Sequence, residues 1–277
     1  MRHTAIYDHG EWRKSRSMRA SPLAVGIPHL VIAFVAWASS TSAQVNTEAL
    51  RGDAFRKGLS GRVEGTFTGS TGNSQGVVSG GNARLQLKSN THLAFVHSAG
   101  AYSRLNSTTS VERAVVHARY NYEVASWIWG EVFSQIEHDA FRRLTNREIV
   151  GIGLRFHAFR TEDVDLYYGT AYMAEWENLN LVDNDPDDRL TFAHRWSNYI
   201  AVSASLTDRL EAGATLYFQP RFDRFSDWRL LQESFLEVGI TGFVSTKVSV
   251  VIRHDSDPPA SVKKTDLSVT NAFVAKF

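Results

Sequence analysis

Residues 262–277, VKKTDLSVTNAFVAKF, end the chain in a run that alternates between apolar and polar side chains. Leu267, Val269 and Phe273 share one parity with the terminal Phe277, whereas lysine, aspartate, serine and threonine fill most of the other parity. Such alternation predicts a β-strand with one apolar and one polar face. Because a strand at the very end of a chain exposes an unpaired edge unless another strand covers it, the pattern favours a closed barrel.

The same period of two recurs upstream. In residues 209–222, Leu216 and Phe218 lie on the parity opposite to Thr215 and Tyr217. About twelve segments alternate in this way, at residues 61–69, 77–88, 91–104, 111–123, 126–138, 147–160, 163–177, 190–206, 209–222, 229–243, 246–257 and 262–277. Short connections alternate with longer polar ones. We therefore expect an all-β protein, an antiparallel transmembrane β-barrel of about 12 strands with short periplasmic turns and longer extracellular loops.

Composition excludes several classes of protein. The chain has 277 residues, a formal net charge of +1 and no cysteine. No segment is strongly basic, so nucleic-acid binding is not expected, and disulfides and thiol chemistry are ruled out. A mean hydropathy of -0.24 does not oppose a membrane barrel, because a barrel strand presents only every second residue to lipid.

The N-terminus has the pattern of a secretory signal. Arg16 and Arg19 precede an apolar run at residues 22–38, and small residues follow at Thr41 and Ala43. This predicts a signal peptide at residues 1–43, a periplasmic segment at 44–60 and an outer-membrane barrel at 61–277. An uncleaved membrane anchor is the alternative, and translation could begin at Met18. Export of this kind places the barrel in the outer membrane of a Gram-negative bacterium.

Aromatic residues gather near the ends of the predicted strands, among them Trp127, Trp129, Trp176, Trp196 and Trp228. Amphipathic rings favour the headgroup level, so we expect two aromatic girdles. The alternative is the core of a soluble periplasmic β-barrel binding protein. The length of the strands and the charge on their polar face weigh against that alternative, since a soluble barrel needs one dry face.

The last third of the chain resembles a known family. Arg253, Asp255 and Ser256 precede Pro258 and Pro259, and a KKTD run and a strand ending in phenylalanine follow. Residues 227–277 thus resemble the end of the salt-induced outer-membrane protein family (domain of unknown function 481), although His254 stands where that family usually has tyrosine. The resemblance implies an outer-membrane barrel and no known activity. Phe273 and Phe277 also resemble the carboxy-terminal assembly signal of outer-membrane proteins.

Charged residues of the final hairpin form candidate pairs. A turn near Pro259 would set Arg253 opposite Asp266 and Asp255 opposite Lys264 on the lumen side. Two further carboxylates, Glu233 and Glu237, could join them from the neighbouring strand. These groups are either structural pins in a narrow lumen or a charged gate on a solute path.

An enzyme is not expected, nor is a cofactor. His117 and His157 lie on polar strand faces, but no spacing typical of a metal site occurs. The alternative is an outer-membrane lipid hydrolase, because the outward-facing His254 and Ser256 resemble the His-x-Ser arrangement of outer-membrane phospholipase A. A serine hydrolase needs a third group that orients the base. The nearest outward candidate, Asn271, should lie too far away.

The sequence thus predicts a barrel that serves envelope structure or osmotic adaptation, or that forms a narrow solute pore. Its expected partners are outer-membrane lipid and lipopolysaccharide and, during biogenesis, the barrel-assembly machinery. We expect a monomer that binds no nucleic acid.

Overall fold

The computed structural model describes residues 57–277 except 71–75, 107 and 183. The predicted signal peptide and most of the segment at 44–60 lie outside the described residues. The first strand begins at Gly58, so residues 58–60 belong to the barrel. None of the helical structure among the described residues is long and apolar enough to cross a membrane.

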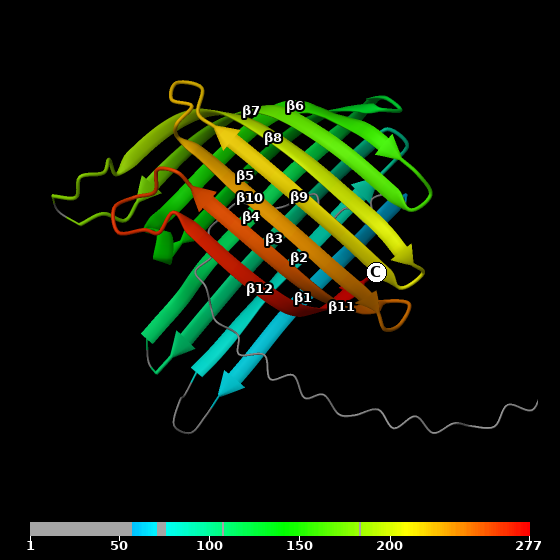
Figure 1. The fold of residues 1–277 in the computed structure, drawn as a ribbon, viewed down its shortest axis with the longest axis horizontal. Helices are drawn as coiled ribbons and strands as arrows, with labels where there is room; N and C mark the ends of the chain where they lie inside the picture. The colour runs from blue at the N-terminus through cyan, green and yellow to red at the C-terminus, as the bar shows by residue number, and fades with distance from the viewer. Residues whose placement is uncertain (1–56, 71–75, 107, 183) are drawn as a thin grey trace, which may run out of the picture. The chain divides into compact units, whose positions relative to one another are not determined.

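Within the described residues, twelve antiparallel strands close into a barrel in which neighbours in sequence are neighbours in space (Figure 1). The strands are β1 (Gly58–Ser70), β2 (Gly76–Lys88), β3 (His92–Leu105), β4 (Thr108–Ala125), β5 (Ile128–Asp139), β6 (Leu144–Arg160), β7 (Val164–Leu179), β8 (Leu190–Thr207), β9 (Leu210–Pro220), β10 (Trp228–Gly239), β11 (Val244–Asp255) and β12 (Thr265–Lys276). One 3-10 helix, η2 (Ala140–Arg142), follows β5. The predicted fold class is therefore confirmed.

The predicted strand boundaries agree well except after β10. The sequence pattern predicts a strand to residue 243, but β10 ends at Gly239. The hydroxyl of Thr241 accepts a hydrogen bond from the amide of Val244 at 3.0 Å, and this closes a tight turn. Apolar residues continue to alternate through the turn, so periodicity alone does not reveal it.

The two faces of the wall follow the predicted parity. In β9, Leu216 and Phe218 are 42% and 41% exposed on the outside, whereas Thr215 and Tyr217 are 3% and 4% exposed inside. An apolar exterior around a charged interior is the reverse of a soluble barrel and is the arrangement that lipid requires. The strands therefore form a transmembrane barrel.

The terminal phenylalanine helps to close the barrel. The backbone of Phe277 exchanges two hydrogen bonds with Gly61, at 2.9 and 3.0 Å. Among the described residues, the register between β1 and β12 then runs only from Arg62, opposite Lys276, to Gly65, opposite Phe273. The backbone of the last residue is thus part of a short seam between the two terminal strands. The role of Phe273 and Phe277 in assembly stays a prediction.

The predicted aromatic girdles include one wrong assignment. Trp127, Trp176 and Trp196 point outward, and Trp228 stacks on His254 with 4.6 Å between ring centroids. Trp129, however, faces the lumen, where its ring lies 6.2 Å from that of Tyr167. Distance from the strand end does not distinguish the two faces of the wall, whereas the parity that Trp129 shares with the buried Glu131 and Phe133 places it inside.

Candidate functional site in the barrel lumen

The two ends of the barrel differ in their connections. We call the end with the connections at residues 180–189, 221–227 and 256–264 the loop end, and the end with those at 89–91, 126–127, 161–163, 208–209 and 240–243 the turn end. The lumen near the loop end is filled by a set of charged side chains that we call the loop-end network. Its members are Arg142, Arg147, Glu175, Glu177, Arg195, Asp227, Arg229 and Asp255.

Glu175 on β7 is the centre of this network. Its side chain is fully buried, and guanidinium groups from three other strands surround it. Arg229 donates to it at 2.7 Å, Arg195 at 2.9 Å and Arg147 at 3.3 Å. A buried carboxylate is tolerated only when charge and hydrogen bonds compensate it, and here three cations do so.

The network also spans the lumen. Arg142 follows β5 and donates to Asp255 on β11 at 3.0 Å, so the bond joins strands on opposite sides of the twelve-strand order. Arg229 donates to the same carboxylate oxygen at 3.0 Å. Asp139 holds the backbone of Arg142 in place, because its carboxylate accepts hydrogen bonds from the amides of Phe141 and Arg142. The two walls are therefore bridged by side chains.

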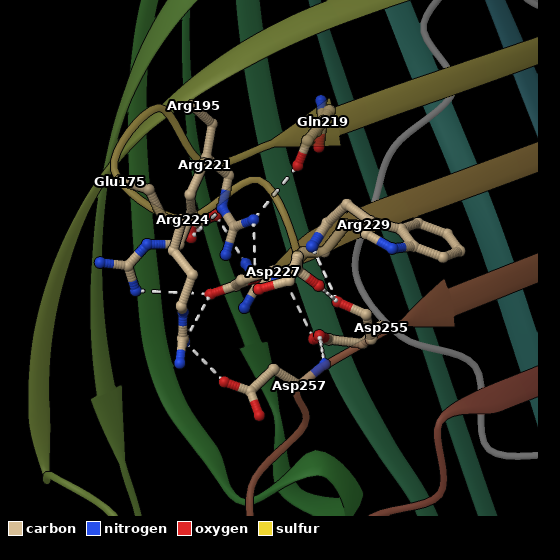
Figure 2. Close-up of polar contacts among 12 residues, drawn as sticks. Glu175, Arg195, Gln219, Arg221, Arg224, Asp227, Arg229, Asp255 and Asp257 are labelled. Carbon is tan, nitrogen blue, oxygen red and sulfur yellow. Dashed lines mark hydrogen bonds and ion pairs between the residues drawn. The ribbon is translucent and has the colours of Figure 1, made fainter.

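Figure 2 shows how the network continues to the rim. The buried carboxylate of Asp227 accepts hydrogen bonds from Arg195 at 3.1 Å, from Arg221 at 3.4 Å and from Arg224 at 3.1 Å. Arg224 also donates to Asp257 at 2.6 Å, which ties the 221–227 loop to the 256–264 loop. Salt screens such exposed pairs far more than the buried ones.

The rim carboxylates are held in their charged form. Two hydrogen bonds from Arg221 lower the pKa of Asp223 to about 2. A hydrogen bond from Arg143 lowers the pKa of Asp185 in the 180–189 loop. Arg143 also donates to the carbonyl of Ala260 at 3.0 Å. Three loops are thereby joined across the end of the barrel.

Two apolar clusters on the wall from β5 to β11, which we call the apolar middle, lie halfway along the lumen, whereas His97, His117 and Arg119 make the wall of β3 and β4 polar. Met173 on β7 lies between Glu175 and the turn end, and packs with Phe133, Ile149 and Ala171. A second cluster contains Tyr199, Ala201, Tyr217, Leu231 and Val251. The ring of Tyr199 fits because residue 169 is glycine, where an added Cβ would lie 2.0 Å from that ring. Its hydroxyl donates to Glu131 at 3.2 Å.

The turn end is hollow by comparison. A cavity of about 510 Å³ opens there, lined by residues of the strands from β2 to β10. Its lining includes Asn121, Trp129, Arg155, His157, Tyr167 and Thr215. A second cavity of about 370 Å³ lies beside Glu211, Glu237 and Lys276. The lumen therefore has a charged network at the loop end, apolar clusters along one wall of the middle, and cavities beside further ion pairs at the turn end.

The predicted hairpin pairs have the expected register but not all the expected partners. Arg253 lies opposite Asp266, and the amide of Asp255 bonds the carbonyl of Lys264 at 2.8 Å. The carboxylate of Asp255, however, binds Arg142 and Arg229, because these guanidinium groups are buried beside it whereas Lys264 is exposed.

The expectation that Glu237 joins the hairpin charges is wrong. Glu237 lies opposite Lys247, six residues from Arg253 and so about 20 Å along the strand. At the turn end it pairs with Arg62 and, at 2.9 Å, with Lys276. Glu233 faces the lumen and is half-buried, opposite Val251. Whether any of these groups acts as a gate stays a prediction.

The proposed hydrolase pair is not assembled. His254 bonds the hydroxyl of Thr265 at 2.8 Å. The hydroxyl of Ser256 donates to the carbonyl of Ser226 and accepts from the amide of Trp228. Asn271 lies opposite Val248, toward the turn end. The geometry therefore gives the hydrolase alternative no support.

Sequence analysis missed most of the loop-end network. Arg147, Glu175, Arg195 and Arg229 all occupy lumen parity near the loop end of their strands, and this shared position was the available signal. It also missed His97, which is buried opposite His117. His117 and His157 do face the lumen as predicted.

Comparison with known proteins places the chain in a family. The model of a family described as protein of unknown function, DUF481, matches residues 63–277. This chain belongs to the DUF481 family. No curated protein matches it. Among solved structures, the DUF481 barrel is similar to a NanC porin, with 12% identity over 78% of this chain and 98% of that chain and a TM-score of 0.48. It is also similar to a KdgM porin, with 11% identity over 79% of this chain and 99% of that chain and a TM-score of 0.40.

The DUF481 barrel is also similar to the translocator domain of the autotransporter NalP from Neisseria meningitidis, with 12% identity over 83% of this chain and 92% of that chain and a TM-score of 0.44.

Proposed function

We propose that this DUF481 protein is an outer-membrane barrel sealed by its own side chains, and that it serves envelope structure rather than the continuous diffusion of solutes. The observation that carries the proposal is the contact of Arg142 with Asp255 across the lumen, reinforced by the three arginines around Glu175. A path along the barrel axis meets this network first and the apolar middle next.

Two further features support a stable seal. Most network members are buried, with Arg147 1% exposed and Glu175 and Arg195 2% exposed. Buried pairs of this kind are little affected by salt. In addition, the contacts of Arg143 with Asp185 and Ala260 hold the loops over the sealed end.

Single-channel recording in a planar bilayer tests the proposal. The mature chain should give no discrete conductance, whereas a Glu175→Ala/Asp255→Ala double variant that still shows heat-modifiable migration should give steps. Glu148→Ala is the matched control, because Glu148 lies beside Arg147 in sequence but on the exposed outer face. Discrete, stable steps from the unaltered protein would overturn the seal.

A narrow gated pore is the second candidate. It is favoured by the construction of the seal, which consists of wall and rim side chains and leaves a cavity of about 510 Å³ behind it. Rearrangement of a few arginines would then suffice for opening. Current that begins only above a threshold voltage, and at lower voltage in the double variant, would favour this candidate.

In either case we propose that the exterior contacts outer-membrane lipid and lipopolysaccharide, and that the barrel-assembly machinery inserts the chain as a monomer. The outward apolar residues at strand positions such as Val269 and Phe273, 52% and 70% exposed, support a lipid-facing exterior.

A further inference from the structure

A sealed barrel does not need the cavity at the turn end, and the wall of that cavity contains an unsatisfied polar atom. Asn121 is 2% exposed. Its amide nitrogen donates to Glu131 at 3.2 Å, while among the described residues its buried carbonyl oxygen has no hydrogen-bond partner. The opposite amide orientation would set that oxygen against the Glu131 carboxylate. A buried acceptor without a donor is costly, so the position favours a ligand that supplies one.

An ordered aromatic wall lies in the same cavity. The guanidinium of Arg155 lies 3.7 Å above the ring of Tyr167, and the ring of His157 stacks on the same tyrosine at 4.3 Å. His157 is fixed in turn by a 2.6 Å hydrogen bond to Asp165. Trp129 completes the wall and is only partly buried. Groups held in this way form a binding surface before any ligand arrives.

Charge and size narrow the class of ligand. Five carboxylate residues and three lysine or arginine residues line the cavity, which disfavours an anion. The wall offers an unused acceptor, on Asn121. A hydroxyl group can donate to this acceptor, and a sugar ring adds a C–H face that packs on tryptophan. The volume lies within the usual range for small-molecule sites.

We infer that the turn-end cavity binds a neutral saccharide of one or two rings, which enters from the periplasmic side. One of its hydroxyl groups donates to Asn121, while a ring face packs against Trp129. This inference is independent of whether the barrel conducts, because the cavity lies on the turn side of the apolar middle.

Calorimetric titration of the full folded barrel tests it. The protein is held in an amine-oxide detergent, since detergents with sugar headgroups would compete. The probes are glucose, cellobiose, glucuronate and putrescine. Saturable binding of cellobiose or glucose is expected. Asn121→Leu and Trp129→Ala should each weaken it about tenfold, the change that about 1.4 kcal/mol produces.

The control is Trp127→Ala, because Trp127 is close in sequence but is 57% exposed on the outside. It should leave binding unchanged. If Trp129→Ala does not reach the heat-modifiable folded form, Trp129→Phe replaces it. The inference is overturned if neither neutral sugar binds, if only glucuronate or putrescine binds, or if the Asn121 and tryptophan variants bind as tightly as the unaltered protein. Loss of sugar binding in a silent barrel leaves the proposed seal intact.

Discussion

The two ends of β7 show how one strand can close a lumen at one end and leave it open at the other. Near the loop end, Glu175 attracts arginines from β6, β8 and β10, whose long side chains reach the barrel axis. Near the turn end, Tyr167 lies against Arg155 and His157 on neighbouring β6, and the space beyond stays open. The lumen of a twelve-stranded barrel is thus narrow enough for arginine side chains to fill it, whereas aromatic rings that lie along the wall leave space at the axis.

The difference is also one of energetics. Buried ion pairs stabilise a fold little when compared with apolar residues of the same shape. Removal of one partner, however, leaves the other charges buried without compensation, and this is strongly destabilising. The loop end therefore depends strongly on each of its members. The turn end, in which neighbouring side chains stack, should tolerate substitution better.

The largest effect is expected for Glu175→Gln. The substitution keeps the shape of the side chain but leaves Arg147, Arg195 and Arg229 buried around a neutral group. We expect the free energy of unfolding to fall by about 3–5 kcal/mol, as when a buried pair loses one partner. Denaturant titration of the folded barrel, followed by heat-modifiable migration, measures it.

Glu148→Gln is the matched control, because Glu148 is exposed on the outer face of β6. Its effect should be much smaller, because the Glu148 carboxylate bonds Asn146 on the same outer face rather than buried arginines. Equal losses from the two variants would show that the loop-end network is no more important than an ordinary surface charge.

The structure of the barrel wall is easier to predict from the sequence than the contacts inside the lumen. Alternation is a local property, so it gave the parity of Tyr217 and Phe218 and the register of Arg253 with Asp266. Partners across a lumen depend on the tilt and stagger of every strand between them. For that reason the contact of Arg142 with Asp255 could not be predicted.

Charge position was informative only in part. Glu175 and Glu237 both occupy the polar parity of long strands, yet they lie at opposite ends of the lumen. The end of the lumen at which a residue lies follows from the number of residues between it and the nearest loop or turn. The number of residues between Glu237 and the turn at 240–243 places it near Arg62 rather than near the final hairpin.

A medium effect is expected for Gly153→Ala in the apolar middle, which separates the two ends. A Cβ at residue 153 would lie 2.3 Å from the backbone oxygen of Thr170 and 2.6 Å from the Cα of Ala171. The backbone cannot move aside easily, so we expect a loss of about 1–3 kcal/mol in unfolding free energy, as for other overpacked sites.

Gly130→Ala provides the comparison for this site, since a Cβ at residue 130 would meet nothing within 4 Å. Both variants change the unfolded chain in the same way, so the difference between their unfolding free energies reports the close packing of β6 on β7. A Gly153→Ala barrel as stable as Gly130→Ala would mean that the middle is loosely packed.

The smallest effect is expected at the exposed rim, where Asp223 pairs with Arg221. The folded-state pKa of Asp223, about 2, lies below the ordinary value of about 3.9. The stabilisation is therefore complete above pH 4 and is lost as the pH falls through 2. Carboxyl-carbon chemical shifts of the folded barrel report this titration.

Replacement of Arg221 tests whether the rim pair behaves differently from the buried loop-end network. In Arg221→Gln, the pKa of Asp223 should rise toward the ordinary value, whereas Arg224→Gln should change it much less, because Arg224 bonds Asp227 and Asp257 instead. Added salt should also raise the pKa of Asp223, since the pair is exposed. The same salt should leave the stability lost in Glu175→Gln unchanged. If salt diminished that loss as well, the loop-end network would be solvated and could not be the seal.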